Sequence, residues 1–378
     1  MKVILVVSNP LTTDNRVRKE AITLSNQGFK IKILTWNYNR DRSGFNEKGI
    51  ELESFNSNSP RGTSKLIQTY LGLLKFQLWV FIKLVKSDFD VVHCIDFDTL
   101  PSGFLAAKLK RKKVVFDILD FYFTFPLLER DTRVLRFISK VLRSLEWPFV
   151  KRADFLIVTT PKYKQYYSKL APKKSIATVY NSPELNFTKP RSKTTREDDF
   201  VISYIGSIRY AKQISRLIRV TKNMPNTKVL IAGSGVKAEE IKRFSKDYKH
   251  VVFHDEVPHS MVADIYNCSS CIYAAYDIQD ENTQFLLPVK VLEAMAFGLP
   301  VIAAKGTYAG DFVEKNRIGL AIGNSPDELE KSIFLLKSDK ILYNEFKRNG
   351  TRLFREKFNW EETSKGLIKI YNKLAESA

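Results

Sequence analysis

The sequence predicts an α/β protein with two domains, each a parallel sheet covered by helices. The chain has 378 residues, which is more than one hydrophobic core usually serves. Its composition, 44% hydrophobic and 27% charged, is ordinary for a globular protein and excludes the disordered, collagen-like and coiled-coil classes. Short apolar segments alternate with helical segments in two series, and a polar stretch separates the two series.

The first series fills the N-terminal half of the chain. The pattern predicts a buried strand over residues 2–7, a helix over 15–27 that ends at Gly28, and a strand over 30–35. Further apolar, β-rich segments lie at 89–94, 113–118 and 154–159. Strands that alternate with helices form parallel sheets with both faces covered, so residues 1–181 are predicted to be a Rossmann-like domain.

Residues 182–199 interrupt this pattern with two prolines and many charges, and they are predicted to be an interdomain linker. Residues 200–358 are predicted to form a second Rossmann-like domain, and 359–378 a helix that packs back on the first domain. The strands of the second domain are expected at 200–205, 228–232, 251–254, 271–276 and 300–304, and its last helices near 326–337 and 340–357. Ligands of such sheets bind at the carboxyl ends of the strands, here beside a cleft between the domains.

Charge is spread unevenly over the chain. The formal net charge is +20, of which residues 1–200 hold +15 and residues 201–378 hold +5. The front half is therefore expected to face an anionic partner, such as a nucleic acid, a phospholipid surface or a phosphorylated substrate. Neither a secretory leader nor a spanning helix is predicted, and three cysteines are too few for a disulfide framework, so a cytoplasmic protein is expected.

A glycine loop at residues 233–238 fits the dinucleotide pattern G-x-G-x-x-A, and Asp255 follows about 20 residues later. This loop leaves an NAD-dependent oxidoreductase open. Against that interpretation, the loop follows the second predicted strand of its domain rather than the first, and any strand-to-helix turn favours glycines.

Asp96 and Asp98 form a D-x-D sequence directly after a predicted strand. Two carboxylates at this spacing are able to hold a divalent ion against a diphosphate. The alternative is that Asp98 or Thr99 caps the helix that follows. Under either interpretation Asp96 is expected to face the cleft.

A phosphate site is indicated where a predicted strand ends at Gly206. Ser207 follows, and the cations Arg209 and Lys212 stand at the start of a predicted helix. Backbone N–H groups at a helix N-terminus bind phosphate, and nearby cations neutralise its charge. A solvated turn is the alternative.

The segment 287–300 predicts a helix that begins after Pro288 and ends at Gly298. Lys290 lies in its first turn, where a cation opposes the helix dipole, which favours an anionic ligand beside it. Glu293 lies one turn later on the same face, in an otherwise apolar helix, and is suited to accept hydrogen bonds from a ribose diol.

The chain resembles the retaining nucleotide-sugar glycosyltransferases of GT-B fold, and specifically the large family 4. The resemblance covers nearly the whole chain, and its most specific motif is PxKxxEAMAxGxP at 288–300. The other motifs occur in the family's order at 14–21, at 90–93 with 96–101, at Gly206 and at 232–235.

The resemblance implies that the C-terminal half binds the donor nucleotide and the N-terminal half the acceptor. Lys212 matches the family's pyrophosphate-binding lysine, Lys290 the lysine of a PxKxxE variant, and Glu293 the second glutamate of a Glu-x7-Glu pair that holds the ribose. The donor-binding residues are thereby expected to be Gly206, Ser207, Arg209, Lys212, Val257, Pro258, Lys290 and Glu293, with Asn15 and Arg16 in an acceptor or phosphate loop.

The chain also departs from the family's pattern. Ser207 stands in place of the usual arginine, which Arg209 is expected to replace; Phe285 stands in place of the first glutamate. Leu119 stands where the acceptor-domain histidine is expected, and these losses put the identity of the sugar in question. The residues left to orient or deprotonate the acceptor hydroxyl are Asp120, Asp98 and Asp96.

The sequence thus predicts a retaining hexosyltransferase that uses a UDP- or GDP-sugar and a glycan or lipid-linked acceptor, with no metal ion or other cofactor. Basic helices with aromatic residues at 61–86 and 130–152 suggest an anionic membrane surface as partner, with the protein peripheral on the inner face of the cell membrane. Helices with solvated outer faces are the alternative there.

The competing functions are a GT-B nucleotide-sugar epimerase, the NAD-dependent oxidoreductase and a basic nucleic-acid-binding protein. No nucleic-acid-binding motif is present, and no specific nucleic acid is expected.

Overall fold

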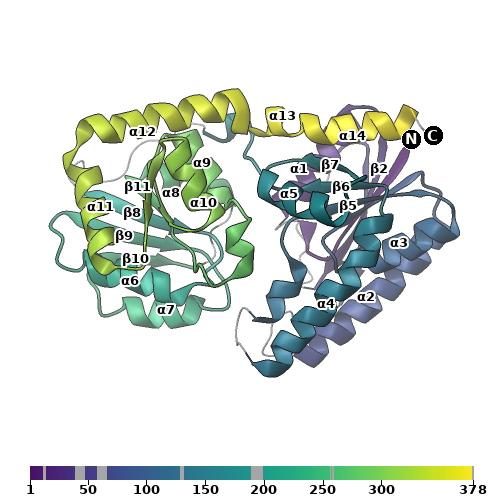
Figure 1. Ribbon diagram of the computed structural model, residues 1–378, viewed down its shortest axis with the longest axis horizontal. Coiled ribbons are helices and arrows are strands. Elements are labelled where there is room, and N and C mark those ends of the chain that lie inside the picture. Colours follow the sequence, from purple (N-terminus) through teal and green to yellow (C-terminus); the bar gives the residue numbers. More distant parts are fainter. Residues whose placement is uncertain are drawn as a thin grey trace. The chain divides into compact units, whose positions relative to one another are not determined.

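A computed structural model describes residues 1–11, 14–38, 47–57, 66–127, 132–188, 199–255, 257 and 259–376. The chain divides into two compact units, which are described here one at a time (Figure 1). Unit 1 comprises Met1–Tyr180 with Thr363–Ala378, and unit 2 comprises Asn181–Glu362. In the part of the chain that the structure describes, no helix is both long and apolar enough to cross a membrane.

Unit 1 is built on a seven-stranded parallel sheet in the order β3-β2-β1-β4-β5-β6-β7. Its strands are β1 (Lys2–Val7), β2 (Lys30–Asn37), β3 (Ile50–Asn56), β4 (Val91–Ile95), β5 (Lys113–Ile118), β6 (Phe155–Val158) and β7 (Ser175–Thr178). The predicted strands of this half are confirmed. The sequence analysis missed β3 and β7, because β3 is an edge strand with exposed charged residues and β7 is only four residues long.

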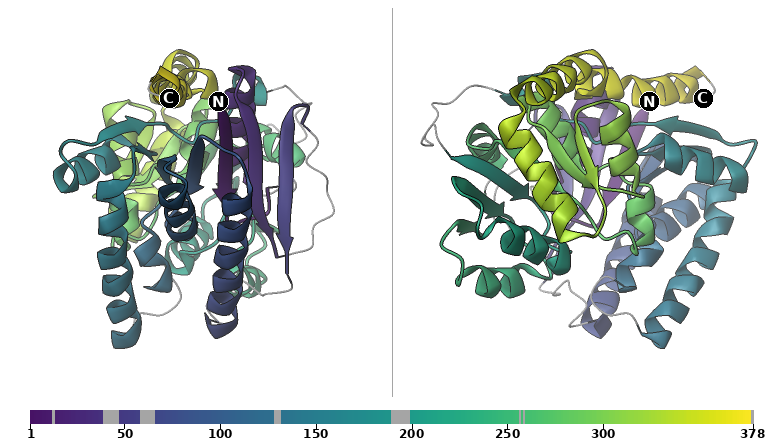
Figure 2. Two further views of the ribbon diagram at one scale, coloured as in Figure 1. Left: turned by 90° about the vertical axis from the view of Figure 1, so that its right-hand side faces the viewer. Right: turned by 60° about the vertical axis from the view of Figure 1, so that its left-hand side comes forward.

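The helices of unit 1 are α1 (Asn15–Asn26), α2 (Leu66–Lys86), α3 (Leu100–Leu109), α4 (Arg133–Arg152), α5 (Pro161–Leu170) and α14 (Lys365–Glu376), with a 3₁₀ segment η3 (Tyr122–Leu127). The helices α2, α3 and α4 form a single layer in which α3 contacts both α2 and α4 (Figures 1 and 2). The C-terminal helix α14 packs against α1 and β7.

Unit 2 is a second Rossmann-like domain, which confirms the predicted fold class. Its parallel strands have the order β10-β9-β8-β11-β12-β13, which reverses direction between β8 and β11. They are β8 (Phe200–Ile205), β9 (Thr227–Ala232), β10 (Val251–His254), β11 (Cys271–Ala274), β12 (Val301–Ala304) and β13 (Gly319–Ile322). The core between sheet and helices is apolar, with Ile202, Ile231 and Ile302 fully buried.

The helices of unit 2 cover this sheet and continue toward the C-terminus. They are α6 (Ala211–Thr221), α7 (Ala238–Ser245), α8 (His259–Asn267), α9 (Val289–Phe297), α10 (Tyr308–Lys315), α11 (Pro326–Ser338), α12 (Lys340–Leu353) and α13 (Trp360–Thr363). Short 3₁₀ segments η4 (Leu185–Thr188) and η5 (Glu281–Gln284) and a π-helical turn η6 (Phe354–Phe358) complete the unit. The start of the predicted linker belongs to unit 2, since η4 packs against α9, and residues 189–198 lie outside the described residues.

Candidate functional site

The glycine loop after β9 supports the neighbouring loop after β8. The Gly206 amide donates to the Ala232 carbonyl at 2.8 Å, and the Ile208 amide donates to the Ser234 carbonyl at 2.8 Å. Gly233 has a φ of +150°, and a Cβ atom there would lie 1.9 Å from the Gly206 carbonyl oxygen. The glycines of the dinucleotide-like pattern therefore serve close packing of two backbones, and the loop that they hold is the one that begins at Gly206.

Lys290 lies beside this loop, in the first turn of α9. Its side chain is only 5% exposed, and its Nζ lies 3.5 Å from the centroid of the Tyr204 ring and 5.2 Å from that of Tyr276. A Cβ atom on Gly206 would lie 4.0 Å from the Lys290 Cε. Tyr204 belongs to β8 and Tyr276 follows β11, so the ammonium lies where the strand order of the sheet reverses.

The Lys290 ammonium has no hydrogen-bond partner among the described residues. Burial lowers its pKa to about 7, and the charge of Glu293 only partly opposes that shift. The N-cap residue of α9 is Pro288, which makes no side-chain capping bond. A buried ammonium without a hydrogen-bond acceptor, at the positive end of a helix, is an arrangement that an anionic ligand would stabilise.

Glu293 lies one turn further along α9 and is half-buried. The Tyr266 hydroxyl donates to Glu293 Oε2 at 2.6 Å. Burial and the nearby Glu293 charge raise the pKa of Tyr266 well above its ordinary value, so Tyr266 remains a donor and Glu293 an acceptor at neutral pH. The arrangement orients one carboxylate oxygen toward the protein.

The other predicted donor-site residues lie in the loops and the helix start that follow β8 and β10. Arg209 Nε donates to Ser207 Oγ at 3.0 Å, so the loop holds this arginine locally. Lys212 is exposed in the first turn of α6, and Val257 is half-buried after the edge strand β10. Pro258 lies outside the described residues.

In unit 1, the predicted aspartates lie after β4 and β5. Ser8 Oγ, after β1, donates to Asp98 Oδ2 at 2.5 Å, and the Leu119 amide donates to Asp96 Oδ1 at 2.9 Å. Burial and the nearby charges of Asp98 and Asp120 raise the pKa of Asp96 well above its ordinary value. Thus the sheet gathers three carboxyl groups at one edge, and Asp96 is the one suited to carry a proton.

Asp96 also adopts a left-handed backbone conformation, with a φ of +58°. Thr99 occupies the N-cap position of α3, but its hydroxyl donates to the Ile95 carbonyl at 2.8 Å instead of capping the helix. Thr99 is therefore the N-cap residue of α3 by position, as the capping alternative expected, but its side chain makes no capping hydrogen bond.

Arg16 corrects a prediction. The expectation was an acceptor or phosphate loop at Asn15 and Arg16, but Arg16 is only 1% exposed and its guanidinium is engaged on every side. It donates to both oxygens of Asp117 at 3.0 and 3.1 Å and to the Val179 carbonyl at 2.8 Å, and it forms an ion pair with Glu20 at 3.0 Å. Asn15, by contrast, is half-buried at the start of α1. A guanidinium held in this way is part of the core of unit 1.

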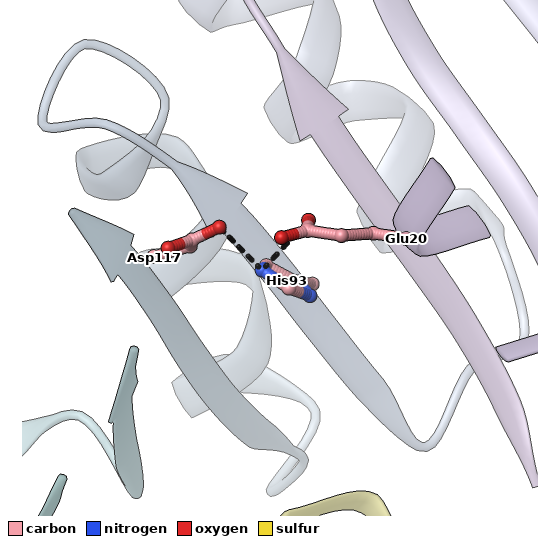
Figure 3. A group of neighbouring side chains, drawn as sticks. All are labelled: Glu20, His93 and Asp117. Carbon is pink, nitrogen blue, oxygen red and sulfur yellow. Dashed lines mark ion pairs between the residues drawn. The ribbon is translucent and has the colours of Figure 1, made fainter. Parts of the chain in front are cut away.

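The carboxylates around Arg16 belong to one buried network. Glu20, His93 and Asp117 approach one another from α1, β4 and β5, with His93 Nε2 at 3.9 Å from Glu20 and 3.8 Å from Asp117 (Figure 3). Burial raises the pKa of Glu20 well above its ordinary value. Burial works in the same direction on Asp117, but the Arg16 guanidinium and His93 outweigh it and lower that pKa to about 2.

Glu20, His93 and Asp117 also form a potential metal-binding group, since their ligand atoms lie within 4.8 Å of one another. The residues present do not suit a metal ion, because the Arg16 guanidinium already binds Glu20 and Asp117 and would repel a second cation. His93 Nδ1 in turn lies 2.8 Å from the Tyr371 hydroxyl of α14. The network therefore fastens the C-terminal helix to the core of unit 1.

Sequence reasoning found Lys290 and Glu293 but missed the tyrosines that surround them. Tyr204 was part of an apolar strand pattern, and Tyr266 and Tyr276 are distant from α9 in sequence. Their hydroxyl groups carried a usable signal, because a tyrosine in a buried strand or helix needs a hydrogen-bond partner.

Family models match both units. A model described as glycosyl transferases group 1 matches residues 186–353, and one described as glycosyl transferase 4-like domain matches residues 13–182. An uncharacterized glycosyltransferase of Methanocaldococcus jannaschii is 22% identical over 80% of this chain and 80% of its own length. The chitobiosyldiphosphodolichol beta-mannosyltransferase of Kluyveromyces lactis is 22% identical over 95% of this chain and 88% of its own length.

Solved structures share the fold of the whole chain. The sucrose-phosphate synthase of Thermosynechococcus elongatus superposes with a TM-score of 0.80 at 16% identity, covering 100% of both chains. Anabaena HepE in complex with UDP-glucose superposes with a TM-score of 0.71 at 15% identity, covering 100% of this chain and 99% of its own.

Proposed function

The chain belongs to the group 1 glycosyltransferases, with a GT-B fold, and we propose that it transfers a hexose-type sugar from a UDP- or GDP-sugar to an acceptor with retention of configuration. Unit 2 would bind the donor and unit 1 the acceptor. The observation that carries this proposal is the buried Lys290 ammonium without a hydrogen-bond acceptor, beside Gly206 and the first turn of α9. The complex of HepE with UDP-glucose supports a nucleotide sugar as ligand.

The chemistry of the leaving group sets the role of each donor-site residue. Departure of a nucleoside diphosphate develops negative charge on its terminal phosphate. Lys290 would contact that phosphate, and Arg209 and Lys212 would neutralise the charge from the exposed side. In this proposal these cations stabilise the leaving group without a metal ion.

Glu293 would hold the ribose of the donor. Its Oε2 accepts a hydrogen bond from the Tyr266 hydroxyl, which orients the carboxylate. Val257 and Pro258, after the edge strand of the sheet, would lie near the base.

The acceptor hydroxyl would be oriented by the aspartates of unit 1. Asp98 is held by Ser8 and Asp96 by the Leu119 amide, whereas Asp120 is half-buried after β5. In this proposal the hydroxyl attacks from the face that the diphosphate leaves, its proton passes to a departing phosphate oxygen, and Asp120 or Asp98 orients it. Asp96 would stay protonated because burial and two neighbouring carboxylates raise its pKa.

A lipid-linked glycan is the proposed acceptor. The mannosyltransferase of Kluyveromyces lactis supports this, since its name places its substrate on diphosphodolichol. Such an acceptor lies at a bilayer, so the protein would act as a peripheral protein on the inner face of the cell membrane.

Thermal unfolding with UDP, GDP, ADP and NAD, each in the presence of EDTA, tests the donor site. A ligand at a hundredfold excess over its dissociation constant stabilises the folded state by about 2.7 kcal/mol, which is a shift of a few degrees. We expect UDP or GDP to give this shift, and Glu293→Ala to reduce it. A shift with NAD alone would point to an oxidoreductase instead.

Transfer itself is tested by release of the nucleoside diphosphate from UDP- and GDP-hexoses. Release that depends on an added lipid extract supports transfer to a lipid-linked acceptor. Interconversion of the nucleotide sugar without any acceptor would support an epimerase and contradict the proposal.

A further inference from the structure

The outward face of α2 is apolar. Its inward face packs on the sheet through Phe76, Val80 and Leu84, all fully buried. Helical geometry places a second set of large apolar side chains directly opposite that face. These are Leu71, Leu74, Leu78 and Ile82, which are 42% to 66% exposed.

The aromatic residues of α2 do not form this outward face, contrary to what a basic, aromatic amphipathic helix would suggest. Phe76 stacks on Trp36 at 5.5 Å between ring centroids, and Trp79 stacks on Phe76 at 6.1 Å. Phe76 thus belongs to the core of unit 1 and Trp79 packs against it, whereas the most exposed large apolar side chains of α2 are leucine and isoleucine.

Two neighbouring helices continue the apolar surface. In α4, Ser139, Glu146 and Val150 are buried, and the exposed apolar residues lie on the opposite side of the helix. They are Val134, Phe137, Val141 and Leu145, with Phe137 68% exposed, and α3 between the helices adds Leu105 and Leu109. The layer of α2, α3 and α4 in Figure 2 therefore exposes an apolar surface, which we call the α2–α3–α4 face.

The helices of this face carry an excess of positive charge, although Lys83 is paired with Glu53 of β3. The three helices contain ten lysine and arginine residues and a single acidic residue, Glu146, whose carboxyl is buried against Tyr167. On α4 most of the cations line one flank of the apolar stripe, and Trp147, 39% exposed, lies among them, whereas the Arg143 guanidinium lies over the Phe123 ring. The cations of the face are Lys75, Lys83, Lys86, Lys108, Arg133, Arg136, Lys140, Arg143, Lys151 and Arg152.

We propose that the α2–α3–α4 face docks on an anionic lipid bilayer, with its leucine, isoleucine and phenylalanine side chains inserted among the acyl chains. Apolar insertion flanked by cations and an interfacial tryptophan is what binding to an anionic bilayer requires. A second copy of the chain fits less well, because two such faces would bring their cations together. The inference deepens the peripheral location proposed above by naming the surface that would dock, and it does not depend on the identity of the donor.

Co-sedimentation with vesicles tests the proposal. Wild-type protein is expected to bind vesicles of phosphatidylcholine and phosphatidylglycerol, and to bind vesicles of phosphatidylcholine alone at least about tenfold more weakly. The variant Leu74→Ser/Leu78→Ser/Phe137→Ser keeps every charge and changes only exposed side chains, so it is expected to fold and to lose at least about tenfold in partition. The variant Lys75→Gln/Lys140→Gln/Lys151→Gln should lose the preference for the anionic lipid.

A matched control removes equally exposed apolar residues from unit 2. Phe334→Ser/Leu335→Ser/Ile341→Ser should bind anionic vesicles like the wild type. Stabilisation by UDP or GDP should be unchanged in all three variants, which separates docking from donor binding. If the wild type ignores anionic vesicles, or if the α2–α3–α4 variant binds them equally well, the proposal is overturned.

Sedimentation velocity without lipid adds a further outcome. A wild-type dimer that the leucine variant converts to a monomer, without any binding of vesicles, would make the face an interface between copies and would also overturn the proposal. Vesicle binding that persists when no nucleotide stabilises the protein would leave docking intact and contradict only the proposed transfer reaction.

Discussion

Lys290 Nζ lies 3.5 Å from the centroid of the Tyr204 ring, and no carboxylate in the described part of the chain accepts a hydrogen bond from it. The other deeply buried cation discussed above, Arg16, behaves oppositely, since it binds Asp117 through two nitrogens and Glu20 through an ion pair. The electron-rich faces of the Tyr204 and Tyr276 rings stabilise the Lys290 ammonium only partly, through cation–π interactions. From this contrast we assign Arg16 to the fold and propose that Lys290 binds a ligand.

Binding of UDP or GDP should take up a proton above pH 7. The pKa of ligand-free Lys290 is lowered from 10.5 to about 7, so the amine is mostly neutral at pH 8, and a bound diphosphate would recharge it. Affinity should therefore fall by up to about tenfold per pH unit above 7. Calorimetric titration at pH 8 in two buffers of different ionisation enthalpy measures the uptake, and heats that do not depend on the buffer would contradict this assignment.

The lowered pKa of Lys290 also determines how the stability of the ligand-free protein depends on pH. The folded-state pKa lies below the unfolded value, so the unfolded chain binds more protons between pH 7 and 10.5. This group therefore makes the unliganded protein more stable as pH rises through that window. The variant Lys290→Met should remove both this contribution and the proton uptake.

Gly233→Ala should disturb the donor loop. The added methyl group would meet the Gly206 carbonyl oxygen at 1.9 Å, so the Gly206 loop must move, and affinity for the nucleotide should fall at least about tenfold. Gly306 offers a matched control, because it also has a positive φ, +77°, but nothing lies within 4 Å of an added Cβ. Gly306→Ala should cost only backbone strain of roughly 1 kcal/mol and leave binding unchanged. Equal loss of binding in both variants would contradict the supporting role of Gly233.

Arg16→Met should destabilise unit 1 by about 3–5 kcal/mol, because it removes the guanidinium that neutralises the buried Asp117 carboxylate. The double variant Arg16→Met/Asp117→Asn should recover part of that loss. Arg18→Met, two residues along the same helix, removes an ion pair with Glu47 at 2.6 Å that is half exposed, and should change stability by less than about 1 kcal/mol. Urea unfolding curves measure all three, and similar losses for Arg16→Met and Arg18→Met would show that the buried network contributes no more than a surface pair.

Glu146 should make unit 1 less stable as pH rises from 4.5 toward 7. Burial raises the pKa of this carboxyl from 4.5 to about 7, although the Tyr167 hydroxyl donates to it at 2.7 Å. The folded state therefore holds a proton that the unfolded chain releases, and this stabilisation is lost as pH rises through the folded-state pKa. Glu146→Gln should gain a few degrees in Tm relative to the wild type between pH 5 and pH 8. If the Tm difference between Glu146→Gln and the wild type is the same at pH 5 and pH 8, the assigned titration of Glu146 is contradicted.

The sequence was sufficient for the fold and for the ends of α9, because alternating strands and helices and the Pro288–Gly298 boundaries are local signals. It also pointed to Lys290, since a cation in the first turn of a helix conflicts with the helix dipole. The tyrosine rings around Lys290 could not be predicted, because Tyr204 and Tyr276 reach α9 only through the strand order of the sheet.

Two features that the sequence could not indicate have a common physical cause. Arg16 follows a loop in a region of polar residues, and nothing local indicates that α1 turns this side chain into the core toward Asp117. In α2 the apolar pattern covers two opposite faces, so periodicity alone could not show that Phe76 faces the sheet while Leu74 faces outward. Both cases depend on which face of a helix meets the sheet, and that is a property of the tertiary structure.

The most direct test of the account compares UDP with uridine, and GDP with guanosine, on the wild type and on Lys290→Met. A residue that binds the phosphates should leave affinity for the nucleoside unchanged and reduce the preference for the nucleotide by about 10- to 100-fold. Lys331→Met, an exposed lysine of α11, is the matched control and should behave like the wild type. We expect Lys290→Met alone to lose the preference; a variant that keeps it in full would contradict the assignment of Lys290 to the diphosphate.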